Sequence, residues 1–129
     1  MRAIDTNVLV RFLVADDKAQ ARKARAAIEA GDIFVPMTVL LESEWVLRSG
    51  YGFAPAQVAE GLRGFAGLPG ITIERPAQLA QALDWMIDEM DFADALHLAA
   101  AEDCVAFLSF DRKFAKSAAG RSSIEVLKP

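Results

Sequence analysis

Four acidic residues stand at positions where an α/β sheet can bring them together. Asp5 ends the first short apolar run, and Asp111 comes just after the apolar run VAFLS. Glu42 lies in the first turns of the helix expected after Pro36, and Asp94 lies near the start of the segment DFADALHLAAAE. Because helix starts and the carboxyl ends of parallel strands share one edge of such a sheet, we expect the four carboxylates to converge on one pocket.

A convergent group of carboxylates has a definite chemistry. Like charges at close range raise one another's pKa, and a hard divalent cation removes that cost. Mg²⁺ and Mn²⁺ prefer carboxylate oxygens, and such a cation activates water and neutralises a scissile phosphate. The chain has one His and one Cys, which excludes a Cys/His zinc site and leaves only oxygen ligands. The acidic set therefore favours phosphodiester hydrolysis.

Each of these acids also has a plainer interpretation. Asp5 and Asp111 could serve only as helix N-caps, because Asp is a preferred capping residue. Glu42 could be a surface residue at a helix edge. Glu44, two residues later, points to another face and is expected to be in solvent or in an ion pair.

The segment DFADAL offers two acids for one ligand position. Asp91 and Asp94 are three residues apart and share one helix face. Asp94 stands in the more apolar context, so we expect Asp94 to be the ligand and Asp91 the cap or an outer contact. His97 is expected to support the site or pack, because Mg²⁺ rarely uses imidazole.

Short polar side chains beside the expected ligands could orient carboxylates or water, or could be ordinary helix caps. They are Thr6, Asn7 and Ser109.

The cations after Asp111 are expected to bind a phosphate backbone. They are Arg112, Lys113, Lys116 and Arg121. The cations of the first long helix are expected to form a solvated face. They are Lys18, Arg22, Lys23 and Arg25. Arg11, one turn beyond Asn7, is expected to point toward the site.

The elements that must position these residues alternate along the chain. Short β-type runs predict strands at 2–4, 33–35, 71–74, 105–109 and 124–127. Apolar spacing and caps predict helices at 18–30, 38–50 (with Thr38 as its cap), 55–65, 76–89, 91–102 and 111–119. Residues 8–14 fit either a helix start or a continued strand. Alternating strands and helices predict an α/β sandwich with parallel strands.

Length and charge limit the class of protein further. With 129 residues we expect one domain, residues 1–129, that buries a core without disulfides. The 14 Lys and Arg against 18 Asp and Glu give a net charge of −4, a poor overall match to nucleic acid. Setting aside four metal-binding carboxylates brings the remainder to zero, so a nucleic-acid substrate is not excluded.

No apolar run reaches the roughly 18 residues of a membrane span, and no signal peptide is recognised. We therefore expect a soluble, cytoplasmic protein.

Four segments together resemble the PIN domain family, and specifically the VapC-type toxin ribonucleases of toxin–antitoxin pairs. The segments are IDTNVLVRFL, PMTVLLESEWVLRSGYG, DFADALHLAAA and FLSFDRKF. Their order and spacing are similar to the family over essentially the whole chain. The resemblance implies a three-layer α/β/α sandwich with a central, mostly parallel sheet and helices on both faces.

The resemblance also implies an activity and partners. The family's acidic quartet falls on Asp5, Glu42, Asp94 and Asp111, of which the fourth is the family's most variable ligand. It implies a Mg²⁺- or Mn²⁺-dependent endoribonuclease that acts on RNA. It further implies a homodimer that is inhibited by a small antitoxin protein whose tail covers the active site.

Two other functions compete with this one. A PIN-like module could bind RNA or protein without cutting, although the complete quartet counts against it. A receiver-like phosphoryl switch would need an early acidic pair and a mid-chain acceptor Asp. The pair Asp16–Asp17 follows the wrong segment, and the expected acceptor region GYGFAPAQ contains no Asp.

Overall fold

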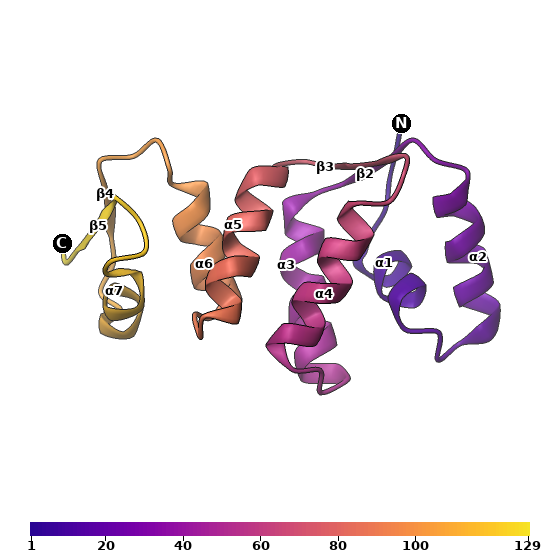
Figure 1. The fold of residues 1–129 in the computed structure, drawn as a ribbon, viewed down its shortest axis with the longest axis horizontal. Helices are drawn as coiled ribbons and strands as arrows, with labels where there is room; N and C mark the ends of the chain where they lie inside the picture. Colours follow the sequence, from indigo (N-terminus) through magenta and orange to yellow (C-terminus); the bar gives the residue numbers. More distant parts are fainter. The chain divides into compact units, whose positions relative to one another are not determined.

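The computed structural model describes all 129 residues, and the chain forms two compact units. The first unit covers Met1–Pro76 and the second covers Ala77–Pro129. Figure 1 follows the alternation of short strands and helices through both of them. None of the helices combines the length and the apolar character that crossing a membrane requires.

The first unit contains a three-stranded parallel sheet in the order β1-β2-β3. Its strands are β1 (Arg2–Ala3), β2 (Ile33–Val35) and β3 (Ile71–Ile73). Its helices are α1 (Thr6–Leu13), α2 (Lys18–Glu29), α3 (Met37–Trp45), the π-helix η1 (Val46–Gly50) and α4 (Pro55–Ala66). Apolar residues from every layer are fully buried, among them Leu9, Ile33, Val35, Leu40 and Leu62. The central strand β2 is buried at both of its ends, as a strand between two neighbours should be.

Of residues 8–14, which the sequence left open, residues 8–13 belong to helix α1 and Val14 is its C-cap. Asp5 follows strand β1 and caps this helix, because its extended backbone lets the side chain accept the N–H of Val8 at 3.0 Å. Asp17 does the same for α2 by accepting the N–H of Gln20 at 3.0 Å. Both Asp residues thus separate consecutive elements.

The helix expected over 38–50 differs in its start and in its end. Thr38 is not its cap: the helix begins at Met37, directly after Pro36. The Met37 N–H donates to the Glu74 carboxylate at 2.9 Å, so a distant residue supplies what a local cap would supply. The last five residues, Val46–Gly50, form the π-helix η1.

The second unit contains a pair of parallel strands and three helices. They are α5 (Pro76–Ile87), α6 (Phe92–Ala100), β4 (Ala106–Leu108), α7 (Arg112–Ala118) and β5 (Glu125–Leu127). The register pairs Ala106 with Glu125. Buried residues of all three helices, including Leu83, Phe92 and Phe114, form the core of this unit.

Candidate active site

Asp5 combines a structural bond with a free oxygen. Its Oδ1 caps α1, while its other oxygen has no partner within the chain, and the residue is exposed. Capping and metal binding are therefore compatible at this position, since a carboxylate has lone pairs for both.

Thr6 links the first acidic position to the second. Its hydroxyl, on the first residue of α1, donates a hydrogen bond to Oε1 of Glu42 in α3. Glu42 is exposed, and its second oxygen has no partner within the chain. This bond holds the Glu42 carboxylate beside the start of α1. Glu44 is separate: only 3% of its surface is exposed, and it forms an ion pair with Arg48 at 2.8 Å.

A cleft of about 380 Å³ brings these residues of the first unit together. Its lining includes five residues singled out from the sequence, namely Asp5, Thr6, Asn7, Arg11 and Glu42. Tyr51 completes the polar wall. Carboxylates, a hydroxyl and a guanidinium in one open cleft can hold a cation and an anion at the same time.

The second unit contains a separate acidic group around Asp94. Asp91 caps α6 by accepting the Asp94 N–H at 3.1 Å. The pKa of Asp94 is raised, first by partial burial and then by the charges of Asp91 and Asp111. His97 and Lys113 act in the opposite direction. Partial burial and two neighbouring carboxylates therefore disfavour the charged form of Asp94.

Asp111 resembles Asp5 in its local role. Its Oδ1 caps α7 by accepting the N–H groups of Lys113 at 2.9 Å and Phe114 at 3.1 Å. Its own N–H donates to the Ser109 hydroxyl at 3.0 Å. Its Oδ2 has no partner within the chain, so this acid too keeps one oxygen for a ligand. Ser109 shapes the turn that presents it.

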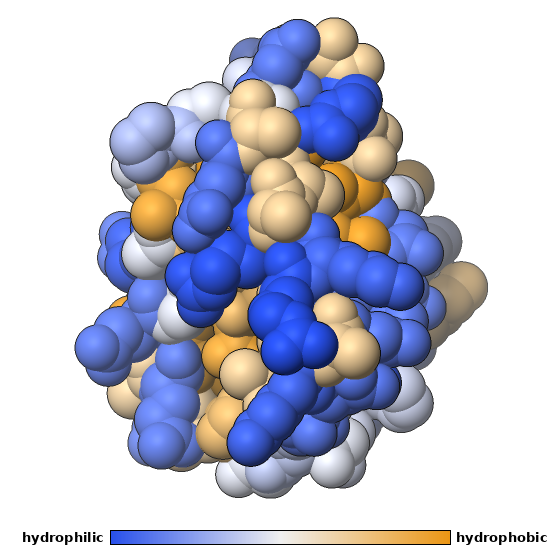
Figure 2. All heavy atoms as spheres, turned by 90° about the vertical axis from the view of Figure 1, so that its right-hand side faces the viewer, coloured by the Kyte–Doolittle hydropathy of each residue, from blue (hydrophilic) through white to orange (hydrophobic).

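The basic residues fall into different roles. Arg112 and Lys113 are exposed on the first turn of α7, next to Asp111. Arg121 is not available for a phosphate backbone, contrary to expectation, because it binds the Asp88 carboxylate at 2.8 Å and the Asp88 carbonyl at 2.6 Å. The four cations of α2 are all exposed, and Figure 2 shows mainly hydrophilic side chains over the side of the molecule that carries this helix.

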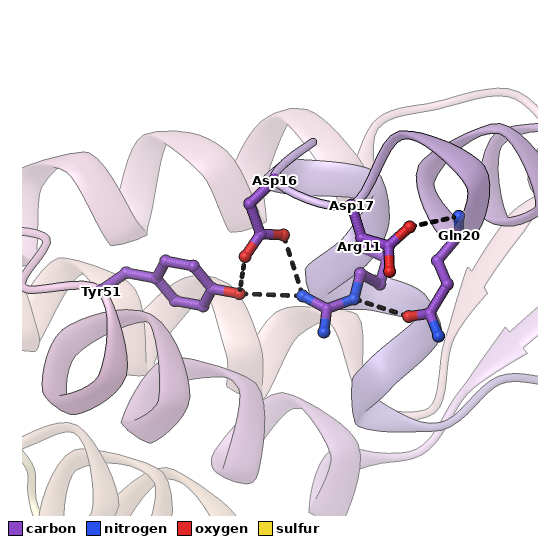
Figure 3. A network of polar contacts seen from close by, with 5 residues as sticks. All are labelled: Arg11, Asp16, Asp17, Gln20 and Tyr51. Atoms are coloured by element: carbon purple, nitrogen blue, oxygen red, sulfur yellow. Dashed lines mark hydrogen bonds and ion pairs between the residues drawn. The ribbon is translucent and has the colours of Figure 1, made fainter.

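Tyr51, Asp16 and Gln20 are contacts that the sequence did not indicate. They surround the Arg11 guanidinium, and Figure 3 shows their bonds. Tyr51 is 40 residues away from Arg11 along the chain, and no periodicity or motif connects two such distant positions.

The donor chemistry of both acidic groups suits a hard divalent cation, because every candidate ligand is a carboxylate oxygen. Asp5 and Glu42 belong to the first unit, and Asp91, Asp94 and Asp111 belong to the second. Within neither unit do three His, Cys, Asp or Glu side chains come close enough to hold a metal ion by themselves.

Comparison with known proteins identifies the family. A model of the PIN domain family matches residues 3–120. The chain belongs to the PIN domain family. This confirms the resemblance seen in the sequence, and with it the α/β/α fold class with a mostly parallel sheet. The parallel pairing of every strand in the structure agrees with that class.

One solved structure matches this chain. It is VapC20 of Mycobacterium tuberculosis, described as a toxin that cleaves the sarcin–ricin loop. The similarity amounts to 20% identity and a TM-score of 0.43, over 97% of this chain and 99% of that chain. No curated protein sequence matches this PIN domain chain.

Proposed function

We propose that this PIN domain protein is a VapC-type toxin, an endoribonuclease that hydrolyses RNA phosphodiester bonds. We propose Mg²⁺ or Mn²⁺ as its cofactor, with Asp5, Glu42, Asp94 and Asp111 as ligands. The observation that carries the proposal is the complete set of four acids, each at its place in a family-like segment, in a chain that matches the family over residues 3–120. What unites the two acidic groups in this proposal is that sequence pattern.

The local geometry supports these roles. Asp5 and Asp111 each keep one carboxylate oxygen free while the other caps a helix. The Thr6 hydroxyl fixes the orientation of Glu42. The pKa of Asp94 is raised by partial burial and then by the charges of Asp91 and Asp111, and a bound cation would favour its charged form. When bound, the cation supplies charge for the scissile phosphate and lowers the pKa of water.

Other residues have supporting roles in the proposal. Asp91 and Ser109 hold the backbone that presents Asp94 and Asp111, through a bond of 3.1 Å to the Asp94 N–H and one of 3.0 Å to the Asp111 N–H. Arg112, Lys113 and Asn7 are exposed and would contact the RNA backbone or ordered water.

The partners and the setting belong to the same proposal. We propose that residues 1–129 act as a single PIN domain in the cytoplasm. We also propose that the protein forms a homodimer and is inhibited by an antitoxin protein. The four family-like segments support these proposals, because the resemblance to VapC-type toxins implies a homodimer and an antitoxin partner.

The test is cleavage of total cellular RNA by the purified protein, free of any antitoxin, with Mg²⁺ or Mn²⁺. We expect discrete fragments that disappear with EDTA. We expect Asp5→Asn and Asp94→Asn to lower the rate by at least about 100-fold, because losing mere partners of metal ligands already costs about 10- to 100-fold.

The matched control is Asp103→Asn, which removes the same charge from an exposed residue outside both acidic groups. It should cleave like the wild type. Cleavage that survives in Asp5→Asn would identify a contaminating nuclease. A folded wild-type protein that cuts no RNA with either cation would overturn the proposal and favour a binding module.

A further inference from the structure

Arg11 is held in a fixed orientation by three side chains. Its Nη1 donates to Asp16 at 2.9 Å and to the Tyr51 hydroxyl at 3.0 Å. Its Nε donates to Gln20 at 2.7 Å. The Tyr51 hydroxyl in turn donates to the second oxygen of Asp16 at 2.9 Å, which closes a ring of hydrogen bonds. Arg11 therefore loses little further freedom when it binds a ligand.

One edge of the guanidinium remains available. Nη2 of Arg11 forms no hydrogen bond within the chain, and Figure 3 shows it pointing away from the ring that Nη1 makes with Asp16 and Tyr51. The side chain is one-quarter exposed, with a relative accessibility of 25%. Two N–H groups that are oriented and without a partner, on a partly exposed side chain, are a ready donor pair for an anion.

This free edge belongs to a residue of the acidic cleft. Arg11 lines the cleft together with Asp5, Thr6 and Glu42, and it also lines the neighbouring groove between α1 and α2. An RNA strand whose scissile phosphate is held at the acidic residues through a divalent cation, as proposed, would therefore pass the wall that Arg11 forms. Asp16 offsets part of the charge of Arg11, but a guanidinium can bind two anions through different edges.

We propose that the Nη2 edge of Arg11 binds a non-bridging oxygen of an RNA phosphate that flanks the cleaved one. Asp16, Tyr51 and Gln20 act as positioning residues for that contact. The inference rests on the proposed function, since it assumes RNA in this cleft. RNA is favoured over an acidic peptide because its regular row of phosphates can place one phosphate at a cation held by the acidic residues and a neighbouring one at Arg11.

The test is the kinetics of RNA cleavage with Mn²⁺ at several salt concentrations. Arg11→Gln should raise KM about 10-fold and change kcat less, because charged hydrogen bonds to a ligand contribute mainly to binding. The slope of log(1/KM) against log salt should become shallower by about 0.7, the value for one phosphate contact on a single strand. The matched control is Arg22→Gln, an exposed cation of α2 outside the cleft, which should stay within about twofold of the wild type.

Two further variants separate contact from positioning. Arg11→Lys keeps the positive charge but loses the planar set of guanidinium N–H donors. It should therefore have the salt slope of the wild type but only part of its affinity. Tyr51→Phe keeps the charge and loosens the orientation, so it should raise KM by a smaller factor with an unchanged salt slope. Thermal unfolding of each variant shows whether it is folded.

The outcomes are distinct. Equal effects of Arg11→Gln and Arg22→Gln, or a salt slope unchanged in Arg11→Gln, would overturn the inference. So would an Arg11→Gln variant that cleaves RNA normally and binds an acidic peptide less tightly. If the wild type cleaves no RNA, the proposed function fails, and a gel-shift comparison of the same variants still decides whether Arg11 contacts RNA.

Discussion

The Thr6 hydroxyl determines where the Glu42 carboxylate lies. It is the one hydrogen bond in the cleft that connects the start of α1 to α3, and it reaches across 36 residues of sequence. An exposed Glu has several rotamers of similar energy, so a single donor selects among them. The effect of Thr6 on activity should therefore exceed its effect on stability.

We predict that Thr6→Val lowers kcat/KM for RNA, and the affinity for Mn²⁺, by about 10- to 100-fold. The loss of one hydrogen bond should reduce the free energy of unfolding by only about 1 kcal/mol. Steady-state cleavage, metal titration and urea unfolding measure the three quantities. Thr38→Val is the matched control, because Thr38 is exposed on α3 and does not line the cleft. Equal activity in both variants would show that Thr6 does not position Glu42.

The sequence singled out four acids as metal ligands, which stays a prediction, and it left open how each carboxylate is used locally. It offered capping and metal binding as alternatives for Asp5 and Asp111, whereas the structure shows caps that leave one oxygen free at each position. The preference for Glu42 over Glu44 agrees with the buried ion pair of Glu44. The contact between Arg11 and Tyr51 could not be found, because it depends on a tertiary approach across 40 residues of sequence.

At the scale of elements, two turns approach each other closely where strands β2 and β3 begin. Gly31 and Gly70 both have a positive φ, of +79° and +78°. A Cβ added to Gly70 would lie 2.9 Å from the Cα of Gly31, whereas a Cβ added to Gly31 would have no atom within 4 Å. The Gly70 carbonyl also accepts the Ile33 N–H at 2.8 Å, which sets the register of the two strands. Both glycines thus have a left-handed backbone conformation, but only Gly70 lacks room for a Cβ atom.

We predict that Gly31→Ala lowers the free energy of unfolding by about 1–2 kcal/mol, the cost of a left-handed backbone. Gly70→Ala should cost about 1–3 kcal/mol more, because its methyl group would overlap backbone that cannot move cheaply. Urea denaturation of the two variants measures the difference directly, and each serves as the control for the other. Equal losses would mean that the turns can separate without cost.

Most elements were predictable from local signals, and the exceptions have tertiary causes. The strand at 33–35 and the helix beginning at Pro55 were predicted with the bounds they have or close to them. The start of α3 at Met37 was not predicted, because its N-terminal hydrogen bond is to Glu74, which directly follows strand β3 and is 37 residues away in sequence. Likewise no periodicity in the sequence indicates that residues 46–50 form a π-helix.

At the scale of the whole molecule, the acidic residues act on stability in two directions. Asp5, Asp91 and Asp111 cap helices, whereas burial and like charges disfavour the charged form of Asp94. The net charge is −4, and three carboxylates of the second unit influence one another around Asp94. Natural proteins keep such uncompensated charge where function requires it, and stability is the usual cost. In the proposed function, a divalent cation bound at Asp94 would relieve this repulsion.

We predict that Asp94→Asn melts at a higher temperature than the wild type in EDTA, because the substitution removes a partly buried charge that Asp91 and Asp111 repel. Mn²⁺ should raise the melting temperature of the wild type, since a ligand that binds only the folded state stabilises it by about 1.4 kcal/mol at ten times its Kd. That increment should be lost in Asp94→Asn. Asp103→Asn is the control for the change in net charge: it should melt like the wild type and keep the full response to Mn²⁺. Asp94 would have a structural role instead if its substitution lowered the melting temperature, and Mn²⁺ would bind elsewhere if both variants responded equally.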